Sequence, residues 1–206
     1  MNFDVLIIGA GPSGLSASIK LAQLAKKNNK ELNIAIVEKG SEVGAHILSG
    51  AVLETKSLDE LIPDWKSKDS PIKTEAIKDN FLLLTKSKSF KLPTPPQMKN
   101  DGNYIVSLGN LSRWLAKQAE ELGVNIFPGF AASEIIYDEK KNKIAGIRTG
   151  DQGIDKEGKQ LENFQKGYDL FAKQTIFAEG CHGSLTKKII NKYNLRENSS
   201  PQTYGI

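Results

Sequence analysis

Three glycines near the N-terminus have the spacing of a phosphate-binding turn. Gly9, Gly11 and Gly14 form G-x-G-x-x-G between an apolar stretch, FDVLIIG, and a helical pattern that begins at Pro12. In such a turn the first glycine permits a tight bend, the second lets the backbone approach a pyrophosphate, and the third lets helix and strand pack closely. The N-terminus of the helix then offers free N–H groups and the positive end of its dipole to an anion.

An acidic residue follows where the ribose of a nucleotide would lie. Glu38 ends a second apolar stretch, NIAIVEK, somewhat further beyond Gly14 than the usual spacing of about 20 residues. A carboxylate at this position can accept hydrogen bonds from both ribose hydroxyls, and it disfavours a 2′-phosphate. The alternative is a turn used only for packing. The pattern as a whole predicts dinucleotide binding.

One α/β domain with parallel strands accounts for the positions of these residues. The strand–helix–strand pattern around the glycines predicts two parallel neighbouring strands. A core of this size needs neither disulfides nor metal. We predict a βαβ unit at 3–40, a flavin and membrane loop at 41–62, an irregular excursion at 63–103, a helix and strand at 108–130, an antiparallel β-meander at 131–179 and the start of a further segment at 180–206.

Helix caps and turns mark the boundaries in the second half of the chain. For the helix that begins near Leu108 we expect Asn110 as the N-cap and Gly123 as the C-terminal stop. In the meander, EKKN at 139–142 and DQGIDKEGK at 151–159 read as turns between strands.

A second element decides between FAD and NAD. The apolar run TIFAEG ends in Ala178, Glu179 and Gly180 and is followed by a short turn that contains Ser184. Many FAD proteins bring such a strand back to the pyrophosphate, whereas an NAD domain continues with alternating strands and helices. The distant third strand and the meander therefore favour FAD, and an ordinary strand end is the alternative.

Composition and charge exclude several other classes of protein. Apolar residues make up 39% and charged residues 25% of the chain, which is ordinary for a globular protein. The net charge of +4 includes only three arginines, without interleaved aromatic residues, so we expect no nucleic-acid partner. Cys181 is the single cysteine, which excludes a disulfide framework and indicates a reducing compartment. The sequence also has no signal peptide and no apolar run of the roughly 18 residues that a membrane span needs.

An uncharged run, VGAHILSGAVL, extends from Val43 to Leu53. It is too short to span a bilayer, and it is too rich in glycine for a simple strand. Gly44 and Gly50 would let the backbone approach a cofactor, which predicts a buried cofactor loop. The other interpretation is a segment over Gly40–Leu61 that dips into one membrane leaflet.

Together these stretches resemble one family of flavoproteins. The segments GAGPSGLSA, VEKGSEVGAHILSGAVL, NYIVSLGNLSRWLA, NIFPGFAASEI and TIFAEGCHGSLTKK, with IPDW and PQTYGI, look like the N-terminal part of the electron-transfer flavoprotein–ubiquinone oxidoreductases. The similarity covers essentially the whole chain. More distant relatives, the geranylgeranyl reductases and aromatic-ring hydroxylases, share the FAD fold and often have Asp at the position of Glu179.

The resemblance implies a fold and an activity. The fold is a Rossmann-like FAD-binding domain of the glutathione-reductase type, similar to that of p-hydroxybenzoate hydroxylase, with an inserted antiparallel β-meander and an incomplete C-terminal part. The activity is that of an electron-transferring-flavoprotein dehydrogenase, which passes electrons from reduced electron-transfer flavoprotein to ubiquinone. The implied location is peripheral or monotopic on the inner membrane, at the bacterial cytoplasmic face or, in a eukaryote, the mitochondrial matrix face. The absence of a presequence favours the bacterial alternative.

The family uses FAD and one [4Fe–4S] cluster, but only the first has candidate ligands here. A four-thiolate cluster cannot be built from one cysteine, so its ligands are absent from this chain. We therefore interpret the chain as an N-terminal fragment or a split gene product. Two alternatives stay open: a flavoenzyme of the geranylgeranyl-reductase type, and a truncated fragment that binds nucleotide without catalysis.

The glycine motif and the resemblance together predict the residues that hold FAD. They are Ile8, Gly9, Gly11, Pro12, Ser13, Gly14, Glu38, Lys39, Gly44, Ala45, His46, Ser49, Gly50, Ala132, Ala178, Glu179 and Gly180.

No further catalytic or metal-binding residue is expected, because the flavin carries the redox chemistry and the chain has no paired carboxylates or catalytic triad. His46 is either a hydrogen-bonding loop residue or a neighbour of the flavin. We expect Cys181 to be a half-buried turn residue, and we expect Trp65 and Trp114 to be packing residues.

Overall fold

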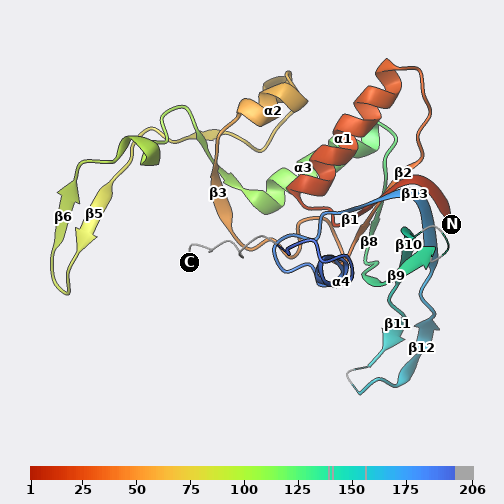
Figure 1. Cartoon of the computed structure of the whole chain (residues 1–206). Coiled ribbons are helices and arrows are strands. Elements are labelled where there is room, and N and C mark those ends of the chain that lie inside the picture. Colours follow the sequence, from red (N-terminus) through yellow and green to blue (C-terminus); the bar gives the residue numbers. More distant parts are fainter. Residues whose placement is uncertain (139, 141, 156, 198–206) are drawn as a thin grey trace.

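The largest sheet of the described residues has six strands and lies on one side of the molecule (Figure 1). The computed structural model describes residues 1–138, 140, 142–155 and 157–197. In spatial order its strands are β8 (Asn125–Pro128), β2 (Ile34–Glu38), β1 (Asn2–Ile8), β13 (Asp169–Phe177), β10 (Lys143–Thr149) and β9 (Ala132–Asp138). The strands are parallel from β8 to β13 and antiparallel from β13 to β9.

The neighbouring parallel strands β1 and β2 are buried over most of their length, as expected for parallel strands covered on both faces. One face packs against α1 (Pro12–Lys27) and α3 (Leu108–Glu121), and the other packs against Leu185 of α4 (Ser184–Lys192). Alternate residues of β1 divide between these two cores: Val5 and Ile7 face α1 and α3, whereas Leu6 and Ile8 face the α4 side. This arrangement confirms the predicted βαβ unit and Rossmann-like architecture.

A smaller antiparallel sheet lies beside α3 and ties the excursion to the core. Its strands are β3 (Gly50–Leu53), β7 (Tyr104–Ser107) and β4 (Thr74–Glu75), and it is accompanied by α2 (Lys56–Leu61) and by two short 3₁₀ helices, η1 (Trp65–Ser67) and η2 (Pro96–Met98).

Both tryptophans are buried in this region. The indole of Trp65 donates a hydrogen bond to Asp59 (2.7 Å), and that of Trp114 donates to the carbonyl of Lys68 (2.9 Å). They serve as packing residues, as predicted.

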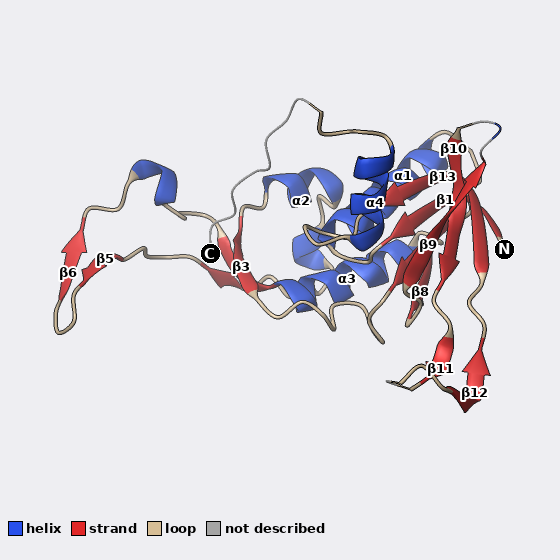
Figure 2. Ribbon diagram, turned by 60° about the horizontal axis from the view of Figure 1, so that its bottom comes forward, coloured by secondary structure: helices blue, strands red, loops and turns tan. Residues whose placement is uncertain are grey.

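Two hairpins project away from the body of the molecule (Figures 1 and 2). One is formed by β5 (Phe81–Leu84) and β6 (Ser89–Leu92), and the other by β11 (Gln152–Ile154) and β12 (Gln160–Gln165). The second hairpin interrupts the predicted meander. The meander itself is present as β9, β10 and β13, and it continues the main sheet because β13 pairs in parallel with β1.

Three sequence-based expectations need correction. The N-cap of α3 is Ser107, whose hydroxyl accepts a hydrogen bond from the N–H of Asn110, so Asn110 is not the cap. The segment 151–159, expected as a simple turn, contains β11. The run Val43–Leu53 was expected not to be a strand, but its last four residues form β3, which pairs with β7. The turn at 139–142 and the PQTYGI segment fall partly or wholly outside the described residues.

A charged network links the two antiparallel strands to β13. Arg148 donates two hydrogen bonds to the carboxylate of Asp169 (2.6 and 3.1 Å) and a third to Glu134 (3.3 Å). The hydrogen bond from Arg148 holds the pKa of the Asp169 carboxyl below its ordinary value. A bidentate pair of this kind fixes the register between β10 and β13.

We expect Asp169→Asn to lower the melting temperature at neutral pH by a few degrees at most, because the pair is solvent-accessible. The depressed pKa means that the stabilisation is fully present above the ordinary aspartate value of about 3.9 and is lost as the pH falls through the lower folded-state value. Thermal unfolding followed by circular dichroism from pH 7 to pH 3 tests this, with the exposed Asp101→Asn as the control. A difference from the unsubstituted chain that stays constant across this range would contradict the assignment.

Candidate functional site

A cavity of about 730 Å³ opens at the carboxyl ends of β1, β2 and β13. In open α/β sheets this edge is where ligands bind. The strand ends Ile8, Glu38 and Phe177 all line the cavity. The chain therefore brings together segments that are far apart in the sequence but share one edge of the sheet.

Most of the residues that the sequence predicts for the cofactor line this cavity. They are Ile8, Gly9, Gly11, Pro12, Ser13, Glu38, Lys39, Gly44, His46, Ala132, Ala178, Glu179 and Gly180. Four predicted residues lie outside the lining. Gly14 lies behind the turn, Ala45 and Ser49 are exposed, and Gly50 is paired with Ser107 in the smaller sheet.

Sequence reasoning missed several other residues of the lining. Those residues are Ala10, Val37, Ile47, Phe130, Ala131, Phe177, His182, Gly183 and Ser184. Most of them are immediate neighbours of predicted residues, so the strand-end signal could have found them. Phe130 carries no such signal, because backbone hydrogen bonds from the N–H of Gly129 to the carbonyl of Gly40 (2.7 Å) and from the N–H of Phe130 to the carbonyl of Glu38 (2.9 Å) bring it to the site.

Of the three glycines in the turn, only Gly11 has open space where a side chain would be, within the described part of the chain. Gly9 has a φ of +104°, and a Cβ there would lie 2.5 Å from the carbonyl oxygen of Ala178. A Cβ on Gly14 would collide with the carbonyl oxygen of Gly9. In contrast, a Cβ on Gly11 would meet no atom of the described chain within 4 Å. The first and third glycines are thus required by packing, and the second faces the open cavity.

The N-terminus of α1 meets this open space without a competing anion. Gly11 is the N-cap, it has no side chain to cap the helix, and the first turn, which is wholly described, contains no acidic residue. The free N–H groups and the dipole of this helix are therefore available to a phosphate. This arrangement fits the pyrophosphate of a dinucleotide.

Glu38 links the glycine turn to the loop that follows β2. Its carboxylate accepts a hydrogen bond from the N–H of Ala10 (2.9 Å) and another from the N–H of Gly40 (2.7 Å). His46 lies on the same side, with its Nδ1 4.0 Å from a carboxylate oxygen of Glu38. A carboxylate has about four acceptor positions, so this side chain can still accept bonds from ribose hydroxyls.

The Glu179 carboxylate holds a helix. It accepts hydrogen bonds from the N–H of Leu185 (3.3 Å) and from both the N–H and the hydroxyl of Thr186 (2.7 Å each), at the start of α4. A cofactor role for the predicted Glu179–Gly180 turn would therefore depend mainly on its backbone. Asp and Glu stabilise helix N-termini in this way.

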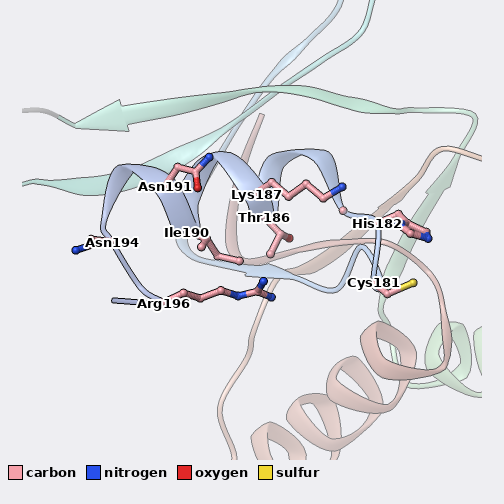
Figure 3. Close-up of a pocket in the computed structure, with 10 residues that line it drawn as sticks. Cys181, His182, Thr186, Lys187, Ile190, Asn191, Asn194 and Arg196 are labelled. Atoms are coloured by element: carbon pink, nitrogen blue, oxygen red, sulfur yellow. The ribbon is translucent and has the colours of Figure 1, made fainter. Parts of the chain in front are cut away.

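A second cavity, of about 750 Å³, lies along α4 (Figure 3). It shares Gly180, His182 and Gly183 with the first cavity, and none of the described residues that line it is acidic. Cys181 lies here and is exposed, whereas the sequence suggested a half-buried residue. Among the described residues, no group of His, Cys, Asp and Glu side chains could hold a metal ion.

Comparison with known proteins supports the nucleotide-binding architecture. A family model described as an NAD(P)-binding Rossmann-like domain matches residues 7–62. Solved structures with this fold include a flavin-dependent monooxygenase in complex with FAD and substrate (TM-score 0.62, 16% identity, 92% of this chain and 32% of that one). A geranylgeranyl bacteriochlorophyll reductase-like protein from Thermoplasma acidophilum is also similar (TM-score 0.54, 19% identity, 87% of this chain and 39% of that one). These likenesses confirm the predicted fold class.

Curated relatives match the chain more closely, along its whole length. It is 56% identical over 205 residues to the mitochondrial electron transfer flavoprotein-ubiquinone oxidoreductase of Dictyostelium discoideum. It is 54% identical to a probable electron transfer flavoprotein-ubiquinone oxidoreductase of Acinetobacter baylyi and 49% identical to the mitochondrial protein of that name from Bos taurus. Between 98% and 100% of this chain is covered, and the chain spans only 33–37% of those proteins. The resemblance to the N-terminal part of this family is confirmed.

Glu38→Gln should lower the stability of the nucleotide-free protein as well as its affinity for nucleotide. The amide offers one acceptor atom instead of two, so the N–H of Ala10 or that of Gly40 loses its partner and faces an NH₂ group. We expect a loss of about 1–3 kcal/mol in the free energy of unfolding. Urea unfolding of the nucleotide-free chain tests this, with the exposed Glu31→Gln as the control. Equal stability of the two variants would mean that Glu38 does not hold the two segments together.

Proposed function

We propose that this chain is the FAD-binding part of a membrane-associated oxidoreductase that passes electrons from reduced electron-transfer flavoprotein to ubiquinone. The observation that carries the proposal is the identity of 49–56% along the whole chain to proteins named for that reaction. The cavity at the ends of the parallel strands, with its glycine turn and Glu38, supplies the matching site. The proposed activity would belong to a complete protein. The relatives named for this reaction are about three times as long as this chain.

FAD, when bound, would supply the exchange of one or two electrons between donor and quinone. The residues of this chain would hold and orient it. Gly11 and the N-terminus of α1 would receive the pyrophosphate, and the Glu38 carboxylate would accept hydrogen bonds from the ribose hydroxyls. The loop residues Gly44, His46 and Ile47 would cover one side of the cofactor. None of these roles requires a catalytic acid, base or nucleophile.

A geranylgeranyl-reductase type of activity is less well supported. The solved structure with that description is 19% identical to this chain, which is a likeness of fold alone. The identity to the ubiquinone oxidoreductases is more than twice as high. The [4Fe–4S] cluster expected in the complete family would have to be held by residues other than those of this chain, which has a single cysteine.

Membrane contact is part of the proposal, and the β5–β6 hairpin is the surface that supports it best. Leu83 and Leu84 are 54% and 69% exposed, and Leu82 and Phe90 are exposed as well. The hairpin turn and β6 also contribute lysines, among them Lys88. Apolar side chains flanked by lysines suit the interface of a bilayer with anionic lipids.

The segment Gly40–Leu61 contributes a smaller apolar surface. Its exposed apolar residues include Leu48, which is 97% exposed, and Val52 on β3. No helix of the described residues is long and apolar enough to cross a bilayer. We therefore propose peripheral or monotopic contact through the hairpin at the inner membrane, at the cytoplasmic face in a bacterium or the matrix face in a mitochondrion.

Gly11→Val should lower the affinity for FAD by at least about tenfold, because the new side chain would occupy the open space in front of α1. The fold should be unaffected, since no described atom lies near that position and the φ of −78° suits any residue. Fluorescence titration with FAD and thermal unfolding of the apo chain measure the two effects. Ser16→Val, in the same helix but outside the cavity lining, is the control. Unchanged flavin retention in Gly11→Val would contradict the proposed site.

Leu83→Asp with Leu84→Asp should abolish binding to vesicles of phosphatidylcholine and cardiolipin and leave FAD affinity unchanged. Burial of two leucines at the lipid interface is replaced by two charges that must stay in water. Leu161→Asp, in the exposed β12 of the other hairpin, is the matched control. Cosedimentation of the variants with vesicles measures the effect. If the control loses binding and the double variant keeps it, the hairpin assignment is wrong.

A further inference from the structure

One wall of the nucleotide cavity is a loop supported from behind by α3. Gly44, His46 and Ile47 line the cavity, and the residues of α3 do not. The loop turns at this point, with hydrogen bonds from the N–H of Ala45 to the carbonyl of Glu42 (3.3 Å) and from the N–H of Ile47 to the carbonyl of Gly44 (3.1 Å). The first of these two bonds is longer than an ordinary N–H···O hydrogen bond.

Two glycines let the loop and the helix touch backbone to backbone. Gly44 has a φ of +84°, and a Cβ there would lie 2.8 Å from the carbonyl oxygen of Gly109 in the first turn of α3. A Cβ on Gly109 would lie 3.4 Å from the carbonyl oxygen of Gly44 and 3.6 Å from that of Ile47. The position of the loop is therefore set by the first turn of α3.

Arg113, one turn further along α3, reaches over this contact. Its Nη2 donates a hydrogen bond to Asn110 Oδ1 (2.7 Å), which fixes the plane of the guanidinium. Its Nη1 lies 3.8 Å from a carboxylate oxygen of Glu42, and a Cβ on Gly44 would lie 3.3 Å from the same nitrogen. Arg113 thus contacts both sides of the loop turn without lining the cavity.

The loop is connected to the ribose end of the cavity through Glu38. The N–H of Gly40, at the start of the loop, donates to the Glu38 carboxylate (2.7 Å), and His46 lies 4.0 Å from it. A displacement of the loop would therefore change the environment of the carboxylate that receives the nucleotide.

We propose that Arg113 is a positioning residue for FAD: it acts through Glu42 and Gly44 to hold the cofactor loop in its binding conformation. This inference rests on the proposed binding of FAD in the cavity. Arg113 does not line the cavity, so its contribution would come from preorganisation of the wall.

Variants of α3 in the full chain test the proposal. Arg113→Ala should raise the Kd for FAD about three- to tenfold, and Glu42→Gln should have a smaller effect in the same direction, as expected for a partly exposed pair. Arg113→Lys should restore part of the affinity, because it keeps the charge but loses the bond geometry to Asn110. Lys117→Ala, one turn along the same exposed face, removes the same charge and should bind FAD normally.

Hydrogen exchange of the nucleotide-free variants gives a second readout. Arg113→Ala should raise the exchange of the amides over 41–48 and leave the amides of β1 and β2 protected, whereas Lys117→Ala should change neither. Equal FAD affinity and equal loop exchange in the two alanine variants would overturn the role of Arg113 and leave the proposed function intact. If the unsubstituted chain binds no FAD, the proposed function fails and this inference fails with it.

Discussion

The carboxylate of Glu38 is the contact on which the site depends. It lies at the end of β2 and accepts hydrogen bonds from Ala10, in the glycine turn, and from Gly40, at the start of the loop. The turn that follows β1 and the loop that follows β2 are thus held together by one side chain. If the carboxylate were removed, two backbone N–H groups at the edge of the cavity would lose their acceptor, and buried or half-buried donors without partners are costly. The carboxylate therefore assembles the binding edge and also remains available to a ligand.

Close backbone approach is the second constraint, and it explains the glycines. Gly9 and Gly14 pack against the end of β13 and against each other, and Gly44 packs against α3. A side chain at any of these positions would move one wall of the cavity. Gly11 differs because its missing side chain leaves a space that no described atom fills. The same residue type thus serves the fold at three positions and leaves room for a ligand at the fourth.

Local signals made part of this architecture predictable. The glycine spacing, the apolar strands and Glu38 depend on neighbours in the sequence. They gave the βαβ unit and, together with the family resemblance, most of the cavity lining. Tertiary contacts decided the rest. Ser107 caps α3 because β7 delivers it there, and Gly50–Leu53 is a strand because β7 offers a partner. Phe130 reaches the cavity through a hydrogen bond to the backbone of Glu38, which no local pattern in the sequence shows.

Two carboxylates stand at the ends of parallel strands, and the structure uses them differently. Parallel strands end with backbone groups that have no partner in the sheet, so the segment that follows must be fixed by other means. Glu179 accepts three hydrogen bonds from the start of α4, which leaves about one of its four acceptor positions free. Glu38 accepts two, so about two positions remain free beside the cavity. This difference in unused acceptors supports the proposal that Glu38 receives the two hydroxyls of a ribose, whereas the Glu179 carboxylate anchors the start of α4.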